Sequence, residues 1–161
     1  MAPSDLAVRV LTDFASDYPL TVDSELPIDD ALADMARFGV RALLATREDS
    51  ESGEREIAGL VTSYDIEGPR ALRFLQASKH SRRPDIHVSR VMTPWDDLSL
   101  LDYDSLRSMT VAELYEMFQG TGLTHVLVVE MDGNAPALVR GLISRAALTR
   151  RLRSIGATGL A

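Results

Sequence analysis

The chain has 161 residues, of which 45% are hydrophobic, and a formal net charge of −7. These values fit one compact globular domain or two small units that share a core. The absence of cysteine excludes a disulfide scaffold, thiol catalysis and cysteine-ligated metal sites, and the acidic balance argues against a nucleic-acid surface. No apolar run approaches the roughly 20 residues of a membrane span. We therefore expect a cytoplasmic protein without a signal peptide or membrane partner.

The first half of the chain predicts, in order, a strand, a helix, two strands and a helix. Pro27 suits the first turn of the first helix, and Gly39 suits its C-cap. The polar stretch 47–55 between the second and third strands predicts a hairpin loop. Gly68-Pro69 is expected to kink or split the second helix. The predicted elements cover residues 20–22, 28–38, 41–46, 56–61 and about 63–76.

Residues 77–88 form the predicted linker between the two halves. Its basic side chains allow two interpretations, a solvated connection or an arm that lies over a bound phosphate. These side chains are Lys79, Arg82 and Arg83. In the second half, Thr110 and Glu113 predict a capping box at the start of a helix. Strands over 124–131 and 136–143 follow, and then a basic helix over 145–154.

One motif occurs in both halves, where a strand runs into a helix. Gly59-Leu60-Val61-Thr62-Ser63-Tyr64-Asp65 returns 82 positions later (59 to 141) as Gly141-Leu142-Ile143-Ser144-Arg145-Ala146-Ala147. The segment 38–44 likewise returns at 121–127. Internal repeats of this kind indicate stacked copies of one unit. We predict a mixed α/β (α+β) fold of two βαββα repeats, residues 1–76 and 89–161, packed sheet to sheet with pseudo-twofold symmetry.

Thr62 and Asp65 allow two interpretations, which do not exclude each other. Free backbone N–H groups at a helix start attract anions, and Asp65 can reach a hydroxyl group of the same ligand. This favours a binding site for a molecule that carries a phosphate and a sugar. Alternatively, Thr-x-x-Asp is a capping box, in which the two side chains satisfy backbone groups of the helix.

In this order, and twice over, the motifs resemble the CBS domain family, named after cystathionine β-synthase, in its tandem form. The resemblance covers roughly residues 5–155. Leu44 and Leu127 stand where the family often has proline. The matching segments are Val91-Met92-Thr93, Gly39-Val40-Arg41-Ala42-Leu43-Leu44, Gly122-Leu123-Thr124-His125-Val126-Leu127 and the motif at 59–65.

The resemblance implies a regulatory sensor that binds an adenosine-containing ligand (AMP, ADP, ATP or S-adenosylmethionine) in a cleft between repeats and requires no further cofactor. Asp65 would accept hydrogen bonds from the ribose hydroxyls, and Thr62 would contact the sugar or the phosphate. Tyr18, Pro19 and Leu20 would line the adenine pocket with Ala42 and Leu43.

The second repeat departs from this pattern. Ala147 stands at the position of Asp65, and its side chain cannot accept a hydrogen bond. Ser144 can still cap its helix, and Arg145 can help to bind phosphate in either cleft.

No catalytic constellation is visible. His80, His87 and His125 are widely separated and lack metal-ligand spacing, so we expect neither an enzyme nor a metal site. The alternative function is a ligand-free structural pair that serves dimerisation or protein interaction. In either case we expect a homodimer formed through the exposed helix faces. The sequence names neither the ligand nor a protein target.

Overall fold

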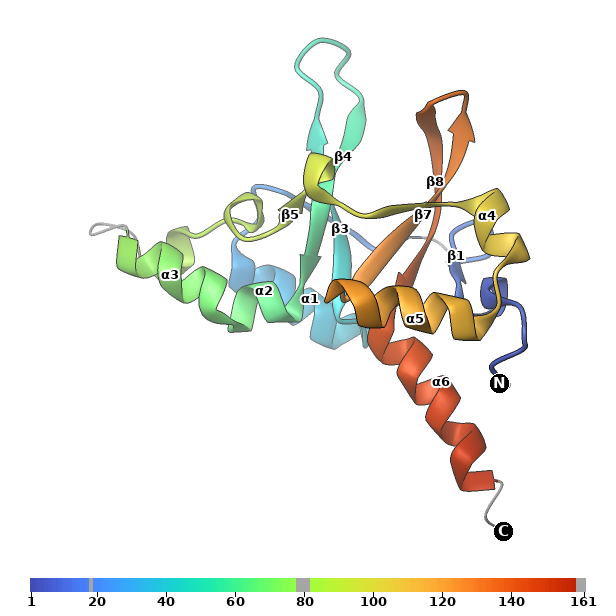
Figure 1. The fold of residues 1–161 in the computed structure, drawn as a ribbon. Helices are drawn as coiled ribbons and strands as arrows, with labels where there is room; N and C mark the ends of the chain where they lie inside the picture. Colours follow the sequence, from blue (N-terminus) through green and yellow to red (C-terminus); the bar gives the residue numbers. More distant parts are fainter. Residues whose placement is uncertain (18, 78–81, 159–161) are drawn as a thin grey trace. The chain divides into compact units, whose positions relative to one another are not determined.

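The computed structural model describes residues 1–17, 19–77 and 82–158, with side chains described as far as residue 153. The contacts divide the chain into two compact units. Residues 19–98 form the first-repeat unit, and the residues before Pro19 join those from Ser99 onward in the second-repeat unit. Each unit contains one four-stranded sheet with helices (Figure 1). The predicted mixed α/β class with two βαββα repeats is confirmed.

The first-repeat unit has the strand order β2-β3-β4-β5. β2 runs parallel to β3, and the other neighbours are antiparallel. Ile28, Met35, Leu43, Val61 and Ile66 belong to the buried core of this unit. The elements are β2 (Thr21–Asp23), α1 (Ile28–Phe38), β3 (Ala42–Glu48), β4 (Arg55–Thr62), α2 (Ser63–Glu67), α3 (Pro69–Ala77) and β5 (Thr93–Pro94).

The second-repeat unit has the strand order β1-β8-β7-β6. β6 runs parallel to β7, and β8 pairs antiparallel with both β7 and β1. Its core includes Leu114, Phe118, Val126, Ile143 and Leu148. The elements are β1 (Thr12–Asp13), β6 (Leu100–Asp102), α4 (Tyr103–Ser108), α5 (Val111–Thr121), β7 (His125–Asp132), β8 (Ala135–Ser144) and α6 (Arg145–Thr158).

Each sheet takes one outermost strand from the start of the other repeat. β1 lies near the start of the first repeat and pairs with β8, and β5 lies near the start of the second repeat and pairs with β4. The motif glycines make this possible. A Cβ atom on Gly59 would lie 2.3 Å from the carbonyl oxygen of Thr93, and one on Gly141 would lie 2.3 Å from that of Thr12. The repeat bounds 1–76 and 89–161 remain a prediction from the sequence motif, whereas the compact units follow the contacts.

The helix boundaries follow local sequence chemistry. α2 ends at Glu67, Gly68 is extended (φ −90°, ψ −170°), and α3 begins at Pro69, so the predicted split of this helix is confirmed. Gly39 adopts the left-handed conformation (φ 67°) as the C-cap of α1. α4, which lies between β6 and α5, was not predicted. No helix in the described part of the chain is long and apolar enough to cross a membrane.

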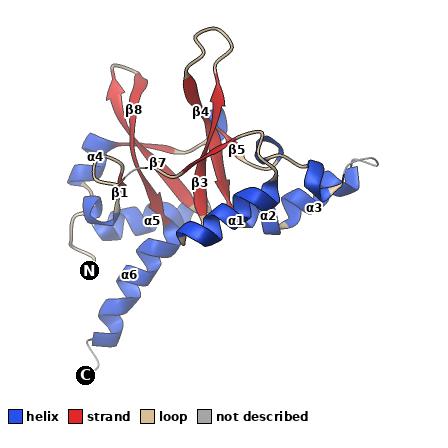
Figure 2. Cartoon of the chain, turned by 180° about the vertical axis from the view of Figure 1, so that it is seen from behind, coloured by secondary structure: helices blue, strands red, loops and turns tan. Residues whose placement is uncertain are grey.

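In both units the two long strands form a hairpin, β3–β4 and β7–β8 (Figure 2). The hairpin loop closes one end of the pair, and the helix that follows the second strand begins at the opposite end. The repeated motif therefore lies at the sheet edge away from the hairpin loop.

Candidate functional site

Three strand ends meet at one edge of the first-repeat sheet. Ala42 pairs in register with Thr62, so the start of β3 lies beside the end of β4. The amide of Leu44 donates to the carbonyl oxygen of Leu20 (3.1 Å), which brings the start of β2 to the same edge. The amide of Ser63 donates to the carbonyl oxygen of Arg41 (2.9 Å) and fixes the first turn of α2 there.

Thr62 and Asp65 form the predicted capping box. The Thr62 amide (2.9 Å) and the Thr62 hydroxyl (3.1 Å) both donate to Asp65 Oδ2. In return, the Asp65 amide donates to Thr62 Oγ1 (3.3 Å). The capping interpretation is therefore correct for the hydroxyl and for one carboxylate oxygen.

The other oxygen of Asp65 faces Arg70. Arg70 Nη1 lies 3.4 Å from Asp65 Oδ1 and donates to the carbonyl oxygen of Val91 (2.7 Å). The Asp65 side chain is 15% exposed and that of Arg70 is 52% exposed, so the pair is accessible to solvent. Arg70 was not among the predicted site residues. The signal for it was the Gly68-Pro69 break, which turns the next helix before Arg70.

The other predicted first-repeat residues divide into two groups. Pro19, Leu20 and Ala42 are half-buried at the edge described above. Leu43 is 2% exposed and packs in the core with Val61, because neighbouring residues of a strand point to opposite faces. Tyr18 lies outside the described residues.

The second-repeat unit builds the same edge without a carboxylate. His125 pairs with Ser144, and the Arg145 amide donates to the carbonyl oxygen of Thr124 (2.9 Å). Ser144 Oγ accepts from the Ala147 amide (3.1 Å), so the predicted cap forms. The Arg145 side chain donates to Gln119 Oε1 (3.2 Å).

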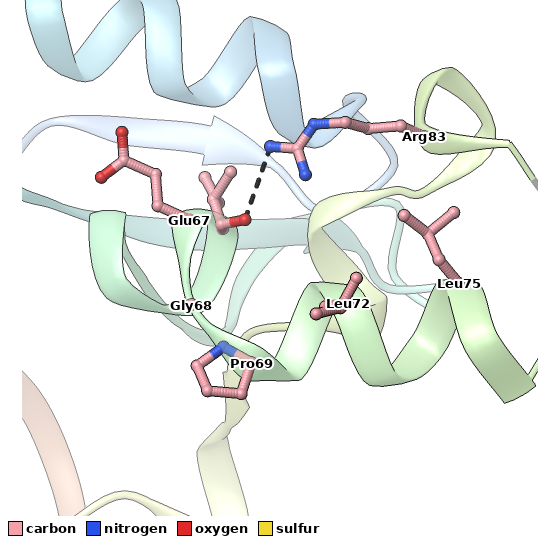
Figure 3. A pocket seen from close by; sticks show the side chains of 7 residues that line it. Glu67, Gly68, Pro69, Leu72, Leu75 and Arg83 are labelled. Atoms are coloured by element: carbon pink, nitrogen blue, oxygen red, sulfur yellow. Dashed lines mark hydrogen bonds between the residues drawn. The ribbon is translucent and has the colours of Figure 1, made fainter.

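The described part of the linker places Arg83 in a structural contact. Its Nε donates to Asp29 Oδ1 (2.9 Å) and its Nη2 to the carbonyl oxygen of Ile66 (3.4 Å), so it braces α1 against α2. Arg83 also borders an open cavity of about 360 Å³ (Figure 3). Arg82 is exposed, and Lys79 lies outside the described residues. The remaining lining residues are Ile66, Glu67, Gly68, Pro69, Leu72 and Leu75.

The comparisons agree with this architecture. The family model described as CBS domain matches residues 11–67. Residues 11–67 are therefore similar to a CBS domain. The predicted resemblance to this family is thus confirmed. A search of curated proteins found no match. The described residues hold no group of three or more histidine, aspartate or glutamate side chains placed to bind a metal ion.

Solved structures, CBS-domain proteins among them, share the fold over most of the chain. CBSX2 from Arabidopsis thaliana in complex with AMP is 19% identical and covers 94% of this chain and 98% of its own, with a TM-score of 0.57. An uncharacterised conserved protein from Pyrococcus horikoshii is 20% identical, and the match covers 95% of this chain and 96% of that protein, with a TM-score of 0.63. The CBS domain of a bacterial CNNM/CorC family Mg²⁺ transporter in complex with ATP is 13% identical, and the match covers 94% of this chain and 89% of that domain, with a TM-score of 0.59.

Proposed function

We propose that this protein is a non-catalytic regulatory module that binds an adenosine-containing ligand at the first-repeat edge. Asp65 carries the proposal. Its carboxylate stands at the junction of β4 and α2, and Oδ1 remains outside the capping box. A carboxylate oxygen has two acceptor sites, so Oδ1 can accept a hydrogen bond from a ribose hydroxyl while it contacts Arg70.

The surrounding residues support this role. Thr62 is 6% exposed and held in place by its cap, so its hydroxyl is fixed at the start of α2. Pro19, Leu20 and Ala42 supply half-buried apolar surface at the same edge, as an adenine ring requires. Structures with this fold that bind AMP and ATP add support from analogy.

The test removes the Asp65 carboxylate and measures binding of AMP, ADP, ATP and S-adenosylmethionine by titration calorimetry. A hydrogen bond to a charged acceptor contributes about 1.5–3 kcal/mol. Asp65→Ala should therefore weaken binding about tenfold to a hundredfold. Because Ala147 provides no acceptor, we expect one ligand per chain.

Glu113→Ala is the matched control for the loss of a cap. Thr110 and Glu113 form a capping box of nearly the same geometry, with the Thr110 amide 2.8 Å from Glu113 Oε2. Both variants should lose about 1 kcal/mol of stability, but only Asp65→Ala should lose ligand. If Asp65→Ala binds as tightly as the wild type, Asp65 is a cap and nothing more.

The alternative, a structural pair that serves dimerisation, is favoured by a different observation. Phe38, Tyr64 and Leu72 are 49%, 58% and 55% exposed on the helices of the first-repeat unit. A homodimer formed through these helix faces would cover them. Light scattering at micromolar concentration tests the dimer, and a dimer that binds none of the four ligands would favour this function over the first.

A further inference from the structure

We infer that Arg70 is the anion-binding residue of the proposed site, so that the site selects adenosine ligands that carry a phosphate. This inference rests on the proposed function and names the ligand class more closely. Of the linker cations in the described part of the chain, Arg83 is engaged by Asp29 and Ile66, and Arg82 is exposed. Arg70 is the cation that the structure places against Asp65.

The break between α2 and α3 produces this contact. In one continuous α-helix, residues five positions apart differ by about 140° around the axis, because each residue advances roughly 100°. Asp65 and Arg70 would then point to different sides of the helix. Extended Gly68 ends α2, Pro69 starts α3, and Arg70 in the first turn of α3 comes back to Asp65.

The donors of Arg70 are only partly used. A guanidinium group has five N–H donors in a rigid fork that matches the oxygens of a phosphate. The contacts of Arg70 to Asp65 and to Val91 both involve Nη1. Among the described residues, Nε and Nη2 have no hydrogen-bond partner. The half-exposed side chain therefore offers one edge of the fork to a ligand beside the Asp65 carboxylate.

The charge of Arg70 also makes a phosphate compatible with Asp65. An aspartate that binds the sugar of a nucleotide stands close to the phosphate on the same sugar, and two negative charges repel each other at short distance. A guanidinium between them attracts both. Without it, the same carboxylate would favour an uncharged adenosine compound over a nucleotide.

The second repeat supplies an internal comparison. The offset of 82 that relates Asp65 to Ala147 relates Arg70 to Leu152. Leu152 packs against the core of the second-repeat unit, on an α6 helix without a break. Both members of the pair are thus replaced together, as expected if the carboxylate and the guanidinium serve one ligand.

The test compares AMP with adenosine on the full chain by titration calorimetry. Arg70→Gln should weaken AMP about tenfold to a hundredfold and leave adenosine unchanged. Arg73→Gln is the matched control, because Arg73 is an exposed cation one turn along the same helix, and it should leave both ligands unchanged. Thermal unfolding of each variant shows that the fold is intact.

Three results would overturn the inference. In the first, Arg70→Gln weakens the binding of AMP and of adenosine equally, which would make Arg70 a positioning residue for Asp65. In the second, Arg70→Gln weakens the binding of neither ligand. In the third, the wild type binds adenosine as tightly as AMP. A wild type that binds neither ligand would instead refute the proposed function itself, so the two failures are distinguishable.

Discussion

Replacing Gly59 by alanine should separate β5 from β4. The added Cβ would lie 2.3 Å from the Thr93 carbonyl oxygen and 3.0 Å from Met92 Sδ, whereas ordinary contacts begin at 3.4 Å. The obstacle is backbone, so the strand itself must move by about 1 Å. Displacements of this size lengthen a hydrogen bond of about 2.9 Å beyond its useful range. β5 pairs with β4 at only two positions, so the whole contact is affected.

The expected cost combines two effects. Overpacking of this kind costs about 1–3 kcal/mol, and a lost hydrogen bond costs roughly 0.5–1.5 kcal/mol. Gly59→Ala should therefore destabilise the protein by about 1.5–4.5 kcal/mol, which lowers the melting temperature by roughly 3–18 °C in a chain of this size. Thermal unfolding followed by circular dichroism measures the shift.

Two further glycines test the reasoning. Gly141→Ala should behave similarly, because its Cβ would meet the Thr12 carbonyl oxygen at 2.3 Å and Leu11 Cδ1 at 2.6 Å. A Cβ on Gly120 in α5 would have nothing within 4 Å, so Gly120→Ala should stabilise the helix by up to about 1 kcal/mol. A Gly59→Ala variant that melts with the wild type, or a Gly120→Ala variant that loses as much stability as Gly59→Ala, would refute this reasoning.

Two other predictions concern the second-repeat unit. Hydrogen bonds from Arg140 and from the Ala15 amide lower the pKa of Asp13 in the folded protein. The ionised carboxylate therefore stabilises the fold above its unfolded pKa of about 3.9. This contribution is lost as the pH falls through the lower folded pKa. Asp13→Asn should therefore melt below the wild type at neutral pH and converge with it in strong acid, and a constant gap across a pH series of melting curves would contradict this. Ala147→Asp should rebuild a Ser-x-x-Asp capping box without lowering the melting temperature. The ligand stoichiometry should stay at one, because Leu152 still stands at the position that corresponds to Arg70. A calorimetric stoichiometry of two would show that the carboxylate alone is sufficient for binding.

The features that the sequence predicted correctly depend on neighbouring residues. The capping boxes at Thr62 and Thr110, the C-cap at Gly39 and the split at Gly68-Pro69 all follow from side chains and backbone preferences within a few positions. The internal repeat then extended these local predictions to the whole fold, because two copies of one pattern confirm each other.

The features that it did not predict depend on distant or very short segments. β1 and β5 have two residues each, too few to show any hydrophobic period, and their partners lie in the other repeat. The role of Gly59 as a point of close strand approach was hidden for the same reason. The burial of Leu43 follows from the alternation of side chains along a strand, since Leu43 and Ala45 share one face of β3. The contact between Arg70 and Asp65 depends instead on the direction that α3 takes after the break.

The comparison between the repeats separates folding from binding at the motif. Ser144 caps α6 alone through the Ala147 amide, so a hydroxyl is sufficient to begin a helix at this junction. In the first repeat, capping accounts for the Thr62 hydroxyl and for Asp65 Oδ2. It does not account for Oδ1 or for the guanidinium beside it. The second repeat folds with Ala147 and Leu152 in their places, so the Asp65–Arg70 pair is more than this type of unit needs in order to fold, and a bound nucleotide gives both groups a role.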